Sequence, residues 1–187
     1  MDATHEHAAE LKIPNRMGFH VRPVQRFAEL ARVFKADVQV TLHGRRVPGK
    51  SVMNLMSLGG RCGDKMEIRA LGEDARQCVA VLKFLAENHF FVEDEPDQIN
   101  PPDRHVCRLA CIASCFDSEI TATVNGATVD AKHKDALLKL DMGPSSKPRF
   151  EYKGADAEQA RAIVENLVNH FYYVEEEMAR QSGKAKA

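Results

Sequence analysis

The residues best suited to chemistry are a histidine, an arginine and a proline at the point where a loop turns into an expected helix. His20, Arg22 and Pro23 follow residues 15–19 and open a run with helical spacing. Proline suits the first helical turn, because its missing N–H costs little there and its φ is already near the helical value. The other N–H groups of that turn and the helix dipole favour an anion. We therefore expect His20 to accept a phosphoryl group, with Arg22 stabilising its charge.

Phosphoryl transfer at a histidine depends mainly on positioning and electrostatic stabilisation. A neutral imidazole nitrogen is a competent nucleophile near pH 7, and the phosphoimidazole that forms is reactive enough to pass its group onward. A histidine beside an arginine at a helix start is a weak signal when it is taken alone. The elements that position His20 therefore have to support the hypothesis.

The first half of the chain alternates between strand patterns and helix patterns. Residues 1–8 are polar and typical of a loose tail. Strands are expected at 9–15, at 37–42, from Arg46 onward and at 64–71, and helices at 22–34, at 52–58 and, capped by Glu73 or Asp74, after Gly72. This order, β-α-β-β-α-β-α, suits an antiparallel sheet with helices on one face.

The second half repeats the first at a constant offset of 82 residues, which places Phe116 opposite Phe34 and Gly126 opposite Gly44. We call this the repeat offset. There are 17 identities among the 62 pairs from 34/116 to 95/177, against about four expected from average residue usage. We therefore expect two copies of one fold. The first domain covers residues 9–92, an acidic linker with prolines covers 93–102, and the second domain covers 103–178.

Two motifs of the first copy resemble the HPr family, the histidine phosphocarriers of the bacterial phosphotransferase system. They are Gly-Phe-His-Val-Arg-Pro at 18–23 and Gly-Lys-Ser-Val-Met-Asn-Leu-Met-Ser-Leu-Gly at 49–59; residues 63–64 and 72–75 also fit. Phe19 and Val21 replace the more usual leucine and alanine. The resemblance implies an α+β fold of tandem HPr-like open-faced β-sandwiches, each a four-stranded antiparallel sheet with three helices on one face. The second copy is degenerate.

The resemblance also implies a function. His20 would accept a phosphoryl group from phospho-enzyme I and pass it to a sugar-specific enzyme IIA domain, with Arg22 stabilising the group. The protein would thus be a carrier with a covalent phosphohistidine rather than a stand-alone enzyme, and it needs no cofactor and no metal. The alternative is a regulatory interaction module, whose partner binding depends on phosphorylation of His20 or Ser51 and which has little role in sugar transport.

Ser51 and its neighbours suggest regulation and docking. Ser51 is a good helix N-cap, which is sufficient reason for a serine there. It also matches the serine that a dedicated kinase modifies in some family members, so an HPr kinase/phosphorylase is a candidate partner. The resemblance places partner contacts at four apolar residues, Phe19, Val52, Met53 and Met56. Leu55 and Leu58 are expected to face the core.

The second copy lacks the nucleophile. At the repeat offset His20 falls on Pro102 and Ser51 falls on His133. We therefore expect a domain that cannot be phosphorylated in this way. Residues 93–98 are acidic and cannot form an apolar first strand, so we expect a three-stranded sheet, or an edge that pairs with its neighbour or with another chain. The second expectation leaves a homo-oligomer open.

Cys107, Cys111 and Cys115 lie four residues apart and would share one face of the second copy's first helix. A structural zinc site usually takes four ligands, and the further ligands are absent from the neighbouring sequence. We expect three small apolar residues that pack against the first domain or a second subunit.

Composition limits the other classes of function. The chain has 187 residues and a formal net charge of −1, so it has no whole-molecule attraction to nucleic acid or membrane. No apolar run approaches the roughly 20 residues of a membrane span. Five cysteines are an odd number, which does not suggest a disulfide framework, and a reducing cytoplasm is the simplest location.

Overall fold

The computed structural model describes residues 5–91, 101–140, 142, 146 and 148–169, and the side chains of residues 101–104 are not among those described. The chain divides into two compact units, Met1–Asp97 and Gln98–Ala187. Most of the expected linker, 93–102, lies outside the described residues. Among the described helices none is long and apolar enough to cross a bilayer.

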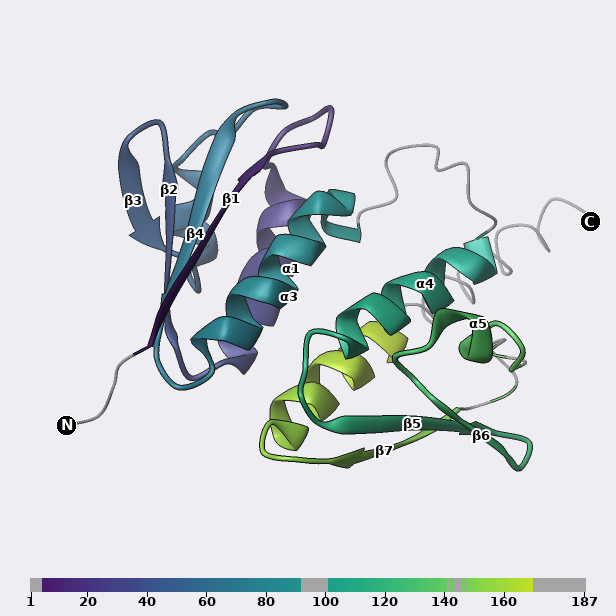
Figure 1. Ribbon diagram of the computed structural model, residues 1–187. Helices are drawn as coiled ribbons and strands as arrows, with labels where there is room; N and C mark the ends of the chain where they lie inside the picture. The colour runs from purple at the N-terminus through teal and green to yellow at the C-terminus, as the bar shows by residue number, and fades with distance from the viewer. Residues whose placement is uncertain (1–4, 92–100, 141, 143–145, 147, 170–187) are drawn as a thin grey trace, which may run out of the picture. The chain divides into compact units, whose positions relative to one another are not determined.

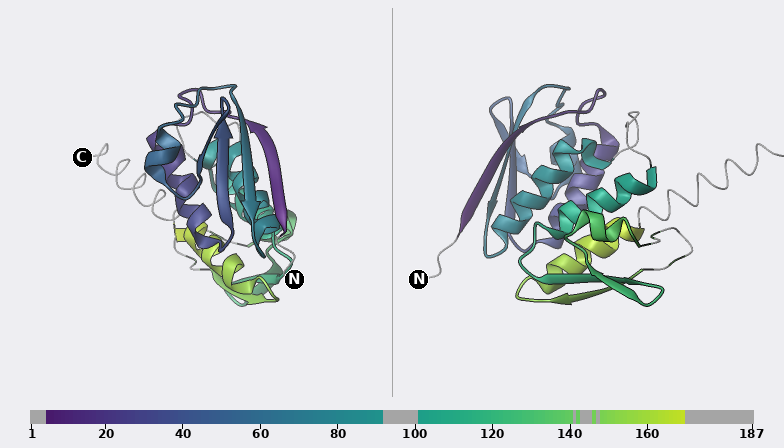
Figure 2. Two further views of the ribbon diagram at one scale, coloured as in Figure 1. Left: turned by 90° about the vertical axis from the view of Figure 1, so that its left-hand side faces the viewer. Right: turned by 45° about the vertical axis from the view of Figure 1, so that its right-hand side comes forward.

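The first unit is a four-stranded antiparallel sheet with helices on one face (Figure 1). The strand order is β1-β4-β2-β3. Its strands are β1 (Glu6–Lys12), β2 (Asp37–Leu42), β3 (Arg45–Pro48) and β4 (Lys65–Leu71). Its helices are α1 (Val21–Val33), α2 (Val52–Met56), α3 (Ala75–Glu87) and the single turn η1 (His89–Phe91). Figure 2 shows the strands side by side, with α1 and α3 behind them. The expected fold class is confirmed for this unit.

Alternating burial explains the sheet. Val38, Val40 and Leu42 of β2 are buried, and the residues between them are partly or fully exposed. Phe27 and Leu30, on the apolar stripe of α1, are buried as well. The two periodicities, two in the strand and 3.6 in the helix, thus bring one face of each element to the same core.

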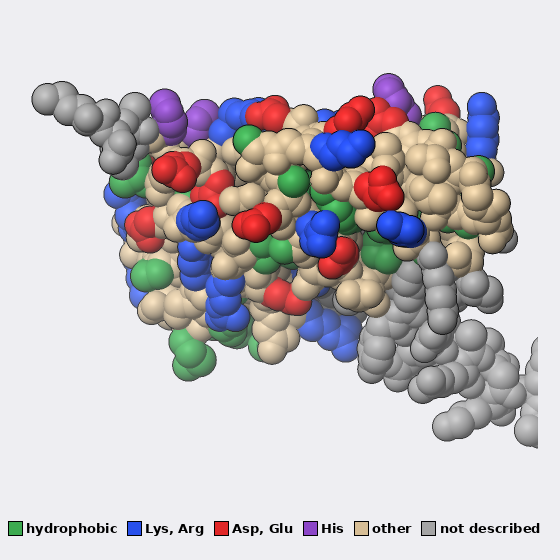
Figure 3. All heavy atoms as spheres, turned by 90° about the horizontal axis from the view of Figure 1, so that it is seen from below, with side chains coloured by type: hydrophobic (Ala, Val, Ile, Leu, Met, Phe, Trp, Pro, Cys, Tyr) green, Lys and Arg blue, Asp and Glu red, His purple; other side chains and the backbone are tan. Residues whose placement is uncertain are grey.

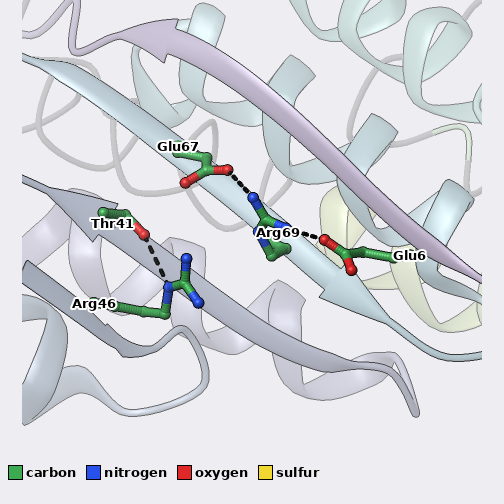
Figure 4. Close-up of polar contacts among 5 residues, drawn as sticks. All are labelled: Glu6, Thr41, Arg46, Glu67 and Arg69. Carbon is green, nitrogen blue, oxygen red and sulfur yellow. Dashed lines mark hydrogen bonds and ion pairs between the residues drawn. The ribbon is translucent and has the colours of Figure 1, made fainter. Parts of the chain in front are cut away.

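The strand β1 begins earlier than expected, at Glu6 instead of residue 9, and it ends at Lys12. The apolar pattern missed its start, because cross-strand charges rather than buried side chains hold that end. Arg69 of β4 pairs with Glu6 and with Glu67 on the open face of the sheet, as Figure 4 shows. On the same face Arg46 donates to Thr41.

Helix ends also differ from the sequence expectation. The short helix α2 ends at Met56 rather than 58, and Ser51 caps it, since its hydroxyl accepts from the N–H of Asn54 at 3.4 Å. Leu55 and Leu58 are buried, as predicted. Asp74 stands at the start of α3 but does not cap it by a side-chain hydrogen bond. Its carboxylate instead joins α3 to the segment before β2, as described below.

The second unit has a three-stranded antiparallel sheet of order β6-β5-β7 (Figure 1). Its strands are β5 (Glu119–Val124), β6 (Ala127–Asp130) and β7 (Arg149–Lys153). Its helices are α4 (Pro101–Ala113), α5 (Lys134–Leu137) and a last helix over 157–169. The expectation of three strands is confirmed for the described residues. The helix α4 begins at Pro101, inside the expected linker, because proline is compatible with a first helical turn.

Strand registers agree between the units at the offset found in the sequence. Asp37 pairs with Leu71 in the first unit, and Glu119 pairs with Lys153 in the second. Both residues of the second pair stand at the repeat offset from those of the first. The hairpins β2–β3 and β5–β6 agree in the same way.

The hydrogen bonds of one aspartate carboxylate in each unit also agree between the units. The Asp74 carboxylate accepts from the N–H groups of Lys35 and Ala36 at 2.7 and 2.8 Å. At the repeat offset, the Asp156 carboxylate accepts from the N–H groups of Asp117 and Ser118, both at 2.8 Å. In each unit one carboxylate therefore satisfies two backbone donors that precede a strand.

Acidic and basic side chains are interspersed on the face that Figure 3 draws, without an extended region of one sign. This agrees with a formal net charge of −1.

Candidate functional site

His20 stands directly before the first residue of α1, Val21. Its backbone is extended, with φ −88° and ψ −170°, and its carbonyl accepts from the N–H of Val24 at 3.0 Å. The imidazole makes no cap hydrogen bond to the helix, and the residue is half-buried. The side chain therefore leaves the backbone at the positive end of a 13-residue helix.

The first turn of α1 is arranged to receive an anion. Val21 and Arg22 are exposed, while Pro23 is buried. The first N–H groups of a helix have no partner within it, and proline removes one of them. The positive end of the helix dipole favours negative charge at this turn, and the Arg22 guanidinium can supply charge-assisted donors to it. The structure brings His20, Arg22 and Pro23 together as predicted.

The loop before His20 is held by its backbone. The N–H of Gly18 donates to the carbonyl of Asn15 at 2.8 Å, and the N–H of Phe19 donates to the carbonyl of Gly60 at 2.9 Å. Gly18 has φ +74°, and a Cβ there would collide with the Gly60 carbonyl. Glycine is therefore required at this position for its conformation and for the close approach of the two loops.

Phe19 was expected to contact partners, and this expectation is wrong in the structure. Its side chain is 3% exposed and packs on Phe27 edge-to-face, with ring centroids 5.8 Å apart. A leucine-to-phenylalanine replacement relative to the family enlarges a core side chain rather than a docking one. The family pattern could not reveal this, because it gives the residue type and not the direction of the side chain.

Four apolar side chains, three of them on α2 and one on the loop before His20, are exposed or half-exposed. Met53 is 80% exposed, and Val52 and Met56 are half-buried, so these three expected docking residues are accessible. Met17 is 72% exposed on the loop that leads to His20, a feature that the sequence analysis missed. A methionine in a loop beside the reactive residue was the available signal, since methionines suit adaptable contact surfaces.

The second unit carries different side chains at the corresponding places. Pro102 lies among the residues whose side chains are not described. His133 replaces Ser51 before α5; it is exposed, makes no cap hydrogen bond and lies 3.5 Å from Asp130. Asp135 replaces Met53 and is exposed, while Leu137 remains buried. The core position is kept, and Asp135 makes one exposed position polar, whereas Leu138, at the position of Met56, is apolar and 38% exposed.

The three cysteines of the second unit differ from the expected packed stripe. Cys115 lies beyond the end of α4 at Ala113, and its thiol donates to the carbonyl of Cys111 at 3.4 Å. Cys111 is exposed in the single chain, and Cys107 and Cys115 are partly exposed; the packing of this face against the first domain or a second subunit stays a prediction. Burial raises the pKa of Cys115 to about 11, and partial burial and the nearby Cys107 raise the pKa of Cys111. Among the described residues no group of three or more histidine, cysteine, aspartate or glutamate side chains could hold a metal ion.

Comparison with known proteins agrees with the geometry of the first unit. A family model for the PTS HPr component phosphorylation site matches residues 8–88. The phosphocarrier protein HPr of Neisseria meningitidis is 35% identical over 80 residues, which are 43% of this chain and 90% of that protein.

A longer protein and a solved structure are similar to the same part of the chain. The multiphosphoryl transfer protein of Xanthomonas campestris is 43% identical over 58 residues, which are 31% of this chain and 7% of that protein. A crystal structure of HPr from Thermoanaerobacter tengcongensis is 31% identical, covers 46% of this chain and 98% of its own, and has a TM-score of 0.45. The match to the Neisseria protein covers nearly all of a phosphocarrier, so through residues 8–88 this chain belongs to the HPr family of phosphocarrier proteins of the phosphotransferase system.

Proposed function

We propose that His20 accepts a phosphoryl group from phospho-enzyme I and passes it to a sugar-specific enzyme IIA domain. One observation carries the proposal, namely the place of His20 directly before α1 with Arg22 and Pro23 in the first turn. The family acts in this phosphoryl relay, and the geometry supplies both the nucleophile and the donors that stabilise the transferred charge.

The accepting nitrogen is Nδ1 of His20. The Nε2 atom is buried, so a phosphoryl donor cannot reach it. In the first step the bond between phosphorus and the donor breaks, the donor keeps the electron pair, and Nδ1 forms a new bond to phosphorus. In the second step the same exchange moves the group to the acceptor, and the imidazole returns to its starting state.

The experiment uses the full chain with enzyme I and phosphoenolpyruvate. We expect an acid-labile phosphoryl adduct that His20→Ala abolishes and that His43→Ala, at an exposed histidine in the same unit, leaves unchanged. Nuclear magnetic resonance of the adduct distinguishes Nδ1 from Nε2. An enzyme I that phosphorylates another HPr but leaves this chain unmodified would overturn the carrier function.

Transfer onward separates the carrier from a regulatory module. The alternative function is partner binding that depends on phosphorylation of His20 or Ser51, with little transport of sugar. The place of Ser51 supports this alternative, because Ser51 caps α2 beside the exposed Met53. A phosphate on Ser51 would add negative charge there. A phosphorylated chain that binds an enzyme IIA domain without giving up its phosphoryl group would support the regulatory function.

Partner docking is assigned to Val52, Met53 and Met56. Their exposure on α2 supports contact with enzyme I or an enzyme IIA domain, and Met53→Glu tests it. We expect this substitution to raise the apparent KM of enzyme I for this chain, while the free energy of unfolding of the first unit is unchanged. An unchanged KM would remove α2 from the docking surface.

The second unit is proposed as a degenerate HPr-like domain without a nucleophile. The agreement of strand registers and of buried carboxylates at the repeat offset supports this proposal. The cytoplasmic location, a homo-oligomer and an HPr kinase/phosphorylase as partner stay predictions.

A further inference from the structure

A short segment after α3 packs beneath the loop that carries His20. It is the turn η1, His89–Phe91, and it lies just beyond residue 88, where the family match ends. Phe90 is fully buried and Phe91 is 2% exposed. Two large aromatic side chains outside the family's matched region are therefore part of the core of the first unit.

Phe90 contacts the residue next to the nucleophile. Its ring centroid lies 5.1 Å from that of Phe19 and 6.5 Å from that of Phe27. Phe19 directly precedes His20, and its N–H is already held by Gly60. The three rings form one cluster below the backbone from which the His20 side chain leaves.

The other end of the loop is tied to the same segment. The side-chain amide of Asn15 donates to the carbonyl of His89 at 3.1 Å, and Asn15 is 3% exposed. The carbonyl of Asn15 also accepts from Gly18. The segment thus holds both ends of residues 15–19, one by a buried hydrogen bond and one by an aromatic contact.

The backbone of the segment is strained. His89, Phe90 and Phe91 have φ of 54°, 55° and 56°, a left-handed conformation. Residues with a Cβ rarely adopt it, and a run of three persists only where the surroundings hold it in place. Here burial of both phenylalanine rings and the hydrogen bond from Asn15 hold it.

The sequence of the segment recurs in the chain. Asn88, His89, Phe90 and Phe91 follow α3, and the same Asn-His-Phe followed by an aromatic residue occurs at 169–172. Asn169, the first residue of that second occurrence, is the last described residue of the helix over 157–169, and the residues after it lie outside those described.

We infer that Phe90 is a positioning residue for phosphoryl transfer at His20. By packing on Phe19 it fixes the backbone that presents the imidazole to the donor. The inference rests on the proposed function. A displacement of about 1 Å at a reacting group costs up to about 100-fold in rate, so loosening this support lowers the rate of transfer although Phe90 does not touch the phosphoryl group.

The test compares two truncations in the full chain. Phe90→Ala removes the ring under Phe19, and Phe91→Ala removes an equally large buried ring that packs on Phe84 of α3, with centroids 5.9 Å apart. Phe90→Leu restores an apolar side chain in the same place. For each variant we would measure the thermal unfolding midpoint and, well below it, the single-turnover rate of phosphorylation by phospho-enzyme I.

The expected result is a rate about 10- to 100-fold lower for Phe90→Ala and within about 3-fold of the unmodified chain for Phe91→Ala. Phe90→Leu should recover most of the rate. The loss should fall on the maximal single-turnover rate and not on the concentration that half-saturates this rate, because the docking residues are unchanged. Equal rate losses for the two alanine variants would overturn the inference, since they would report lost stability alone.

Hydrogen exchange keeps the inference separate from the proposed function. The amides of Gly18 and Phe19 are hydrogen-bonded within this loop and to Gly60. They should exchange faster in Phe90→Ala and not in Phe91→Ala. If the unmodified chain takes no phosphoryl group, the proposed function fails. If the chain is phosphorylated but neither exchange nor rate distinguishes the variants, the inference alone fails.

Discussion

The two units share their supports and differ in their chemistry. In the first, Lys50 donates to the carbonyl of Phe34 at 2.7 Å, and in the second Lys132 donates to that of Phe116 at 2.8 Å. Gly72 and Gly154 have φ of 148° and 147°. These features fix backbone geometry and do not depend on a reaction.

The residues suited to chemistry differ between the units, although these hydrogen bonds and glycine conformations agree. His20 stands at the start of α1, whereas the residue at the repeat offset from it is Pro102. Ser51 caps α2, whereas His133 makes no cap hydrogen bond. The comparison teaches that strand registers and buried polar contacts can agree between two units whose residues with chemistry differ.

The number of strands among the described residues also differs between the units. In the first, β1 covers the outer edge of β4, and Ile68 and Ala70 of β4 are fully buried. In the second, Phe150 and Tyr152 stand at these places and are half-buried. Arg161 lies over the Tyr152 ring at 5.4 Å, and burial raises the pKa of Tyr152 above its usual range. Larger aromatic side chains thus occupy the strand that has no β1 counterpart among the described residues.

The largest expected effect concerns the nucleophile. His20→Ala should lower phosphoryl transfer roughly 1000-fold or more, because no other group in the site forms the covalent intermediate. Adding Pro102→His to this variant should not restore transfer if the second unit has also lost the surroundings that the reaction needs. Radiolabel transfer from phosphoenolpyruvate measures both variants. Recovery in the double variant would break the contrast between the units.

The next effect concerns the aspartate carboxylates that accept two backbone N–H groups in each unit. Asp74→Ala and Asp156→Ala should each lower the free energy of unfolding of their own unit by about 2–4 kcal/mol, because two backbone N–H groups lose a charged acceptor. Hydrogen exchange at the amides of β2 and β4, against those of β5 and β7, reports each unit separately. The matched control Glu73→Ala, at an exposed carboxylate, should stay within about 0.5 kcal/mol. A small loss at only one aspartate would mean that the two contacts are not equivalent.

A smaller effect concerns the anion site. Arg22→Gln should slow phosphorylation of His20 about 10- to 100-fold, because a charge-assisted donor is lost where negative charge develops. Thermal unfolding should hardly change, since Arg22 is exposed. Arg104→Gln, at the corresponding position of the second unit, should leave the rate unchanged. A rate loss in that variant would assign the second unit a part in the transfer.

The smallest effect concerns the thiols. With its pKa raised to about 11, Cys115 is mostly protonated at pH 8 and should react with a disulfide reagent much more slowly than the exposed Cys62. Its rate should rise with pH until about pH 11. The folded state favours the neutral thiol of Cys115. The stability that this thiol contributes is therefore present below its pKa in the unfolded chain, about 8.5, and is lost as the pH rises from there towards 11. Fast reaction of Cys115 at pH 8 would contradict this.

Local patterns were sufficient for much of the first unit. The helix around residues 22–34 and the alternating strand at 37–42 could be predicted, since each buries one regular face. The start of β1 could not, because Glu6 is held by Arg69 and not by burial. The contacts that distinguish Phe19 as a core residue also escaped prediction. They join Phe19 to Phe90, which lies at the opposite end of the first unit's sequence, and no periodicity records such a contact.

The most direct test of the contrast between the units is the number and place of phosphoryl groups on the intact chain. The chain would be incubated with enzyme I and phosphoenolpyruvate, cleaved at neutral or alkaline pH and mapped by mass spectrometry. The account predicts one acid-labile phosphoryl group per chain, in the peptide that contains His20. A phosphoryl group on His105 or His133, or none on His20, would contradict it.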